Sequence, residues 1–107
     1  MASGILGQSN PGAATNTTVY TVPAGTFSSF TISAVSLSGA ASVRVAISTS
    51  GTTTPSNNEY IEYESALSAT GDVLERSGLA AEAGRKVIVY SSTANVSFSV
   101  YGFEEAV

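Results

Sequence analysis

Two carboxylates two positions apart, Glu62 and Glu64, are the residues of this sequence that come nearest to a reactive pair. On one strand their side chains would share a face, roughly 6.5–7 Å apart. That spacing would suit glycoside hydrolysis or, through oxygen ligands, a Ca²⁺ site. The alternatives are a solvated strand face or ion pairs with the chain's arginines, Arg44, Arg76 and Arg85. We expect ion pairs or solvation, and therefore no catalytic residue, metal or cofactor.

Most other reaction chemistry is limited by composition. The chain has no His and no Cys, so Ser-His-Asp triads, Cys-His pairs and zinc sites of His and Cys are excluded. Lys86 is its only lysine, and no phosphate loop of the GxxxxGK type occurs. We therefore expect a protein that is not an enzyme.

The charge balance limits the partners. A net charge of −4 with only four basic residues leaves nothing to form a basic stripe, so neither nucleic acid nor an anionic membrane is expected as a target. No apolar run approaches the roughly 18 residues of a membrane span. The first twelve residues lack the basic and apolar regions of a secretory signal, which favours synthesis in the cytoplasm.

Any functional site must be positioned by β-strands, because the apolar residues follow the pattern of a pleated sheet. Eighteen Ser and twelve Thr accompany Val, Ile, Tyr and Phe, while helix formers are scarce. Residues 43–48 and 96–101 alternate with period two, and residues 86–90 are apolar on both faces. Turn formers at 91–95 predict that 86–90 and 96–101 form a hairpin.

Short strands separated by turns predict a single all-β domain at residues 17–105, with an antiparallel jelly-roll-like sandwich preferred to an immunoglobulin-like one. Within the second strand, the apolar positions shift to Val35 and Leu37, which predicts a bulge or a crossing between sheets. The expected strands, about eight in all, include residues 17–22, 28–37, 43–48, 59–64, 73–76, 86–90 and 96–101.

Residues 1–16 are rich in Gly and small polar residues around one apolar pair, Ile5 and Leu6. We expect an extended N-terminal arm. The arm is either a frayed terminus or a segment whose Ile5 and Leu6 dock into a neighbouring subunit.

Once these reactions are excluded, contact with other proteins is the function that the sequence still suggests. A strand apolar on both faces, with Ile88 and Tyr90 opposite its valines, is either sandwiched inside the fold or covered by a partner. Tyr60 is expected on the face of Glu62 and Tyr63 on the opposite face, and exposed tyrosines either stack on sugars or fill a core or subunit contact. The candidate protein-contact residues are Ile5, Leu6, Tyr90, Tyr101 and Phe103.

Five stretches in order carry a family resemblance: TTVYTVPAG at 17–25, VRVAIS at 43–48, EYIEY at 59–63, VLERSGL at 73–79 and VIVYSSTANVSFSVYGFEE at 87–105. Together they resemble the small β-sandwich virion proteins of tailed bacteriophages, particularly those of cyanobacteria. The resemblance implies a capsid decoration (cement) protein that binds over capsid subunit junctions. The alternative is a tail, baseplate or fibre module that contacts host glycans.

The same resemblance implies location in the virion, with the major capsid protein or other virion proteins as partners. A homo-oligomer, trimer or dimer, is expected with it, because closed symmetry satisfies apolar contact patches. The family offers no catalytic motif, so no site residue is transferred from it.

Overall fold

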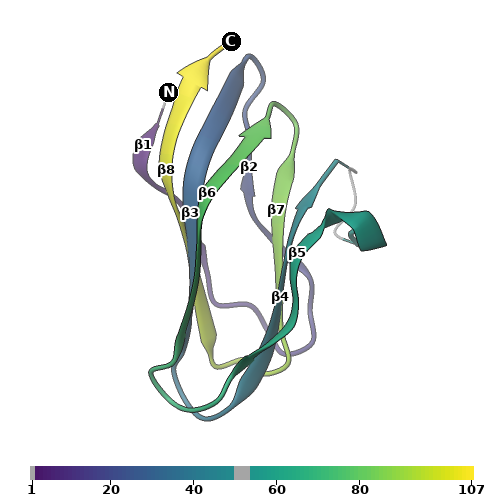
Figure 1. Ribbon diagram of the computed structural model, residues 1–107, viewed down its shortest axis with the longest axis vertical. Helices are drawn as coiled ribbons and strands as arrows, with labels where there is room; N and C mark the ends of the chain where they lie inside the picture. The colour runs from purple at the N-terminus through teal and green to yellow at the C-terminus, as the bar shows by residue number, and fades with distance from the viewer. Residues whose placement is uncertain (1, 50–53) are drawn as a thin grey trace.

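Eight strands and one short 3-10 helix make up this computed structural model, which describes residues 2–49 and 54–107 (Figure 1). The strands are β1 (Ser3–Ser9), β2 (Thr17–Thr21), β3 (Thr26–Ser36), β4 (Ala41–Ser48), β5 (Tyr60–Leu67), β6 (Val73–Glu82), β7 (Lys86–Ser91) and β8 (Val96–Ala106). The helix η1 (Asn57–Glu59) directly precedes β5. Each strand predicted from the sequence is present, and β6 and β8 extend furthest beyond their expected ends.

The strands form two antiparallel sheets, on the left and right of Figure 1, in the orders β1-β8-β3-β6 and β2-β7-β4-β5. We call them the β8 sheet and the β7 sheet. Because β1 pairs with β8, β2 with β7, β3 with β6 and β4 with β5, the chain is an antiparallel ribbon rolled into two layers. This is the predicted jelly roll. The immunoglobulin-like alternative has a different strand order.

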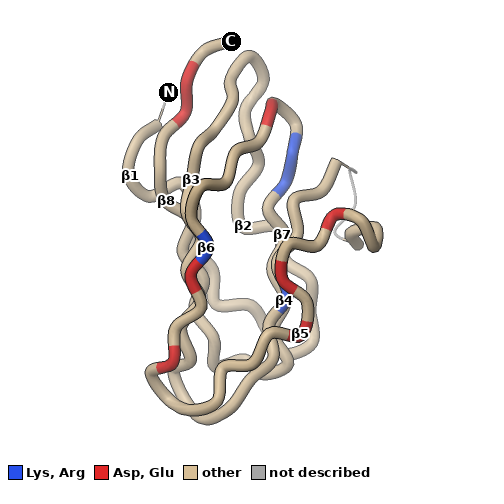
Figure 2. Tube along the Cα trace, in the orientation of Figure 1, with Lys and Arg blue, Asp and Glu red and all other residues tan. Residues whose placement is uncertain are grey.

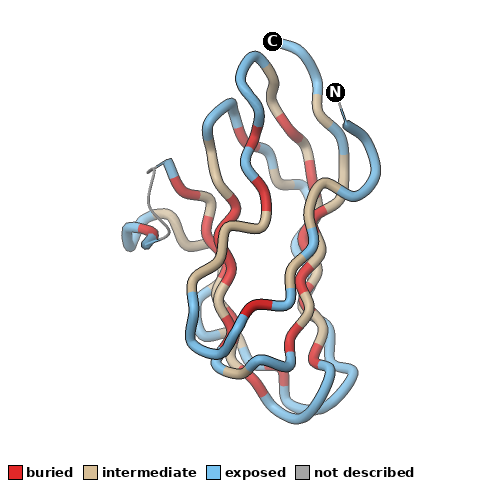
Figure 3. The backbone as a smooth tube through the Cα atoms, turned by 180° about the vertical axis from the view of Figure 1, so that it is seen from behind, coloured by how far each residue is buried: buried red, intermediate tan, exposed pale blue. Residues whose placement is uncertain are grey.

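The core lies between the two sheets, where the alternating strands place their apolar residues (Figure 3). Val43 and Val45 of β4 face Phe98 and Val100 of β8 in one buried cluster, and each is at most 1% exposed. Burying a side chain as large as Phe98 contributes roughly 3 kcal/mol. Period-two alternation is therefore the pattern that specifies this fold.

The predicted hairpin of β7 and β8 is wrong, because the two strands belong to different sheets. β7 pairs with β2 and β4, whereas β8 pairs with β1 and β3. The intervening turn crosses from one layer to the other, and its Asn95 carbonyl accepts a hydrogen bond from the Leu37 amide. Two alternating strands can pair side by side or face each other across a core, and their period does not distinguish these arrangements.

The inner face of β7 is covered by the core, and its outer face is covered at Ile88. Val87 and Val89 point into the core, and Ile88 on the outer face is only 2% exposed. Ile88 lies between Ala46 of β4 and Thr18 of β2 in the sheet register. The chain itself therefore covers Ile88, whereas Tyr90 on the same outer face is only half-buried.

The buried positions of β3 follow one phase from Ser28 to Ser36, so no switch occurs in that strand. Val35 is half-buried on the outer face and Leu37 is 54% exposed beyond the strand end. The predicted bulge or crossing at Val35 and Leu37 is therefore wrong, and the irregularity of this strand pair lies opposite Phe30–Ile32 in β6, where Gly78 has a φ of +72°. Between the pairs Phe30–Leu79 and Ile32–Arg76, β6 has two residues where β3 has one, which makes a β-bulge.

The N-terminal segment differs from the expected arm, because its residues 3–9 are the edge strand β1, paired with β8. Leu6 packs against the core and Ile5 points outward, 56% exposed. A Cβ at Gly7 would lie 2.1 Å from the carbonyl oxygen of Val19, so only glycine lets β1 approach β2 this closely. Strand pairing with β8 supplies the order that the segment's own composition lacks.

Candidate functional site

Glu62 and Glu64 lie on opposite faces of β5, so the predicted shared face is wrong. Val45 pairs with Glu62 but Val43 pairs with Ser65, which leaves one extra residue in β5 between them. Glu64 has a φ of +53° at this bulge. The bulge turns Glu62 into the gap between the sheets and Glu64 outward, and the geometry of a two-carboxylate site is lost.

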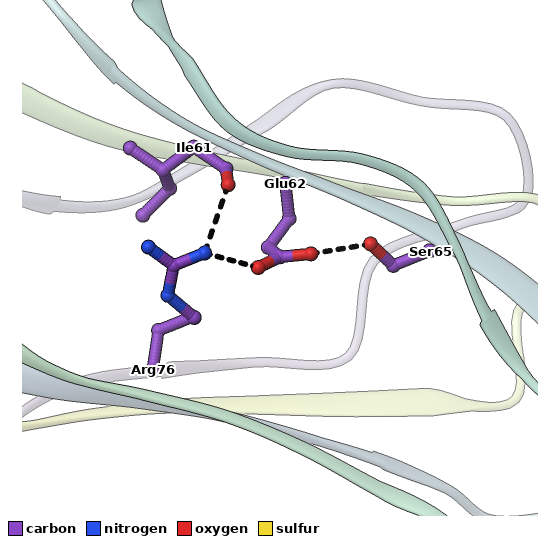
Figure 4. A network of polar contacts seen from close by, with 4 residues as sticks. All are labelled: Ile61, Glu62, Ser65 and Arg76. Carbon is purple, nitrogen blue, oxygen red and sulfur yellow. Dashed lines mark hydrogen bonds and ion pairs between the residues drawn. The ribbon is translucent and has the colours of Figure 1, made fainter.

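Glu62 joins the two sheets at the edge where β5 faces β6 (Figure 4). Arg76 of β6 donates through Nη1 to the Glu62 carboxylate and, at 3.1 Å, to the Ile61 carbonyl. The Ser65 hydroxyl donates to the other carboxylate oxygen. The Ser65 hydrogen bond and then the Arg76 guanidinium lower the pKa of Glu62 below its usual value. The group is thus an ionised structural link.

Glu59 holds together the two ends of the β4–β5 connection. Its carboxylate accepts hydrogen bonds from the Thr49 amide at 2.9 Å, the Thr49 hydroxyl at 3.0 Å and the Ser56 amide at 2.8 Å. These bonds, the backbone amides first, lower the pKa of Glu59 to about 2. The carboxylate is therefore a capping group of η1 and of the connection.

The other charged residues of the described chain are spread over the sandwich, and each ion pair among them joins one carboxylate to one arginine. Figure 2 shows them dispersed over the sandwich, and nowhere in residues 2–49 and 54–107 do three His, Cys, Asp or Glu side chains come close enough to hold a metal. Glu64 pairs with Arg44, and Glu82 pairs with Arg85 at 3.1 Å. The expected ion pairs of Glu62 and Glu64 with arginines are therefore present.

Three of the five candidate contact residues come together on the outer face of the β8 sheet. Ile5 of β1 is directly opposite Tyr101 of β8, and Phe103 follows two positions along the same strand. Ile5 is 56% and Phe103 44% exposed, while the Tyr101 hydroxyl donates to Glu75 at 2.7 Å. We call this surface of Ile5, Tyr101 and Phe103 the Tyr101 face.

The Tyr101 face borders a depression of about 370 Å³ whose lining includes two glycines. Gly102 and Gly78 contribute no side chains there, and a Cβ at Gly102 would meet the Ser29 carbonyl oxygen at 2.1 Å. The rings of Tyr101 and Phe103 therefore stand beside a low floor. Aromatic rings around such a hollow are typical of protein contact surfaces.

The other two candidates lie elsewhere. Leu6 packs against the core, so its predicted role in contacting a neighbour is not supported by its position. Tyr90 is half-buried on the outer face of the β7 sheet, on the opposite side of the sandwich from Tyr101. The five residues thus do not form one surface.

An aromatic row on the β7 sheet is the feature that sequence reasoning missed. The guanidinium carbon of Arg44 lies 4.6 Å from the ring centre of Tyr63 and 4.1 Å from that of Tyr90. Tyr60 meets Tyr63 edge-on with ring centres 5.0 Å apart, although period two had predicted opposite faces. We call Tyr60, Tyr63, Arg44 and Tyr90 the tyrosine row. A second register shift in β5, at Ile61, places the two rings on one face, and no glycine signals it.

Comparisons with known protein families, curated proteins and solved structures give no match. Within the described ranges, no helix has the length and apolar character needed to cross a membrane. What the fold and its surfaces define is an all-β jelly roll with two chemically distinct outer faces.

Proposed function

We propose that this chain is a virion structural protein of a tailed bacteriophage that decorates the capsid. The resemblance over residues 17–105 supports the virion setting. The Tyr101 face supports attachment to a neighbouring protein, because exposed Ile5 and Phe103 lie together on it. Apolar and aromatic side chains gathered around a hollow are what an adhesive surface requires.

The proposed mechanism is stabilisation by mass action. The Tyr101 face binds over junctions between capsid subunits, and any protein that binds only the assembled shell shifts the equilibrium toward that shell. A trimer or dimer would repeat the face around a symmetry axis and strengthen attachment through several simultaneous contacts. The major capsid protein is the proposed partner.

Binding of purified chain to capsids that lack it tests this function. We expect saturable binding with hundreds of copies per particle and a higher temperature of shell disruption. Phe103→Ser should weaken binding at least tenfold, because it removes a large ring from the face. Val73→Ser is the matched control, since Val73 is 59% exposed on the same sheet but outside the face.

A tail, baseplate or fibre module is the second proposal, and the tyrosine row on the β7 sheet favours it because such modules present a surface to the host. Copy number separates the two. A dozen or fewer copies per virion would reject capsid decoration and support the second proposal. Equal binding of Phe103→Ser and wild type would reject the Tyr101 face in either setting.

A further inference from the structure

A pocket of about 510 Å³ lies at one end of the tyrosine row, lined by Asn57, Tyr60 and Tyr63. Tyr63 is 59% exposed although Arg44 lies over its ring. Part of the ring is therefore open to a ligand, although Arg44 lies over it and Tyr60 meets it edge-on. Among the described residues, the lining combines two aromatic rings with one side-chain amide.

The walls of the pocket are held in place by contacts behind them. Arg44 is fixed by the ion pair with Glu64 and by the Tyr90 ring beneath it, and it supports Tyr63 in turn. Asn57 begins η1, whose preceding Ser56 amide is bound by the Glu59 carboxylate. A preformed site loses little conformational entropy when a ligand binds.

We propose that this pocket binds a neutral saccharide. A pyranose ring presents C–H groups on its faces and hydroxyls around its rim. The tyrosine rings match the faces, while the Asn57 amide and the tyrosine hydroxyls donate to and accept from the rim. Tyrosine and asparagine also serve protein recognition. A hollow of about 510 Å³, however, suits a small ligand better than a protein partner, which buries roughly 800 Å² on each side of a stable interface.

The charges around the pocket select a neutral ligand over an acidic one. Arg44, the cation of the row, is already paired with Glu64, so it offers no free charge to a carboxylate or sulfate group. Glu59 adjoins the lining residue Tyr60 in sequence, and the chain carries a net charge of −4. An anionic sugar would meet repulsion there without a compensating pair.

Titration of the isotope-labelled full chain by nuclear magnetic resonance tests the site. The probes are maltohexaose, cellohexaose, mannohexaose and chitohexaose, with hexagalacturonate as the anionic comparison, each up to about 10 mM. We expect at least one neutral probe to shift signals of residues 54–63 and of Arg44. Tyr63→Ala should weaken that binding at least tenfold, and Tyr63→Phe should change it less than threefold, because the ring face remains.

Asn57→Ala is the second variant and should weaken binding about threefold or more through loss of the amide. Leu37→Ala, an exposed apolar residue away from both faces, is the matched control and should leave binding unchanged. The proposal is overturned if no neutral probe shifts these signals, if only the anionic probe does, or if Tyr63→Ala binds as wild type. The Tyr101 face is on the other sheet, so capsid attachment is measured independently of this result.

Discussion

Tyr20 and Glu104 join the two sheets at the edge where β2 faces β1 and β8. The Tyr20 hydroxyl donates to one Glu104 carboxylate oxygen at 2.5 Å, and the Ala2 amide donates to the other at 3.0 Å. At the opposite edge, Glu62 and Arg76 make the corresponding link. Each open edge of the sandwich is thus bridged by one carboxylate, which gives both acidic residues a structural role.

Removing the Tyr20 hydroxyl should destabilise the fold. Tyr20 is 7% exposed, so Tyr20→Phe keeps the packed ring but deletes a hydrogen bond to an ionised group. We expect a loss of about 1–2 kcal/mol in the free energy of unfolding, measured by chemical denaturation. Tyr63→Phe, at an exposed ring, is the control and should change it by less than about 0.5 kcal/mol. Equal stabilities of wild type and Tyr20→Phe would contradict the role of this bridge.

The same residue predicts a loss of stability at alkaline pH. Burial, and then the hydrogen bond to Glu104, raise the pKa of Tyr20 from 10.0 to about 12. The folded state keeps a proton that the unfolded state releases, so this stabilisation is present below pH 10 and is lost as the pH rises toward about 12. Between pH 10 and about 12, the free energy of unfolding of Tyr20→Phe, measured by chemical denaturation, should therefore decline less steeply than that of the wild type. Some decline remains, because Glu75 also raises the pKa of Tyr101.

Acid should weaken the hydrogen bonds by which the Glu59 carboxylate holds Thr49 and Ser56. Its pKa is lowered from 4.5 to about 2, so the stabilisation is present above pH 4.5 and is lost as the pH falls toward about 2. Glu59→Gln should lower the melting temperature at pH 7 and have a smaller effect near pH 2. Glu105→Gln, an exposed carboxylate of β8, is the control. A difference in melting temperature between Glu59→Gln and wild type that stays constant across this pH range would show that the charge of Glu59 does not stabilise the fold.

Gly102 should not tolerate a side chain. An added Cβ would lie 2.1 Å from the Ser29 carbonyl oxygen and 2.7 Å from the Phe30 Cα, and both are backbone atoms of the paired strand β3. We expect Gly102→Ala to cost about 1–3 kcal/mol or more in unfolding experiments. Gly12→Ala, where the nearest atom is 3.8 Å away, is the control and should be close to neutral. A neutral Gly102→Ala would mean that β3 and β8 separate more easily than their register suggests.

Deleting residues 2–9 should damage the fold, because it removes β1 and leaves the β8 edge without its partner. We expect a lower melting temperature and a larger species in solution, since an unpaired strand edge recruits other chains. Light scattering and thermal unfolding measure both. An unchanged melting temperature would restore the hypothesis of a dispensable arm.

The sequence was informative where burial alternates along a strand. Val43 and Val45, and likewise Phe98 and Val100, face the core as their spacing predicted, because the pleat allows only two faces. The pattern did not predict which sheet each strand joins. That choice depends on which apolar faces meet across the core, a relationship between distant segments that local spacing does not contain.

The candidate site was harder to predict because it depends on a bulge. Glu64 adopts a φ of +53° in a segment with no glycine, and this bulge separates Glu62 from Glu64, while a second register shift at Ile61 brings Tyr60 to the face of Tyr63. Ile5 and Tyr101 were identified as contact residues from their type, but their adjacency follows from β1 pairing with β8. Long-range pairing of this kind is specified by the whole fold.

Both ends of the chain emerge at the same pole of the sandwich (Figure 1), where the Glu104 amide donates to the Ala2 carbonyl at 2.9 Å. A fluorescent reporter or a displayed epitope fused to either end would therefore project from that pole. Such a fusion would leave the broad surface of the β7 sheet unobstructed and could be mounted on a particle as a tag.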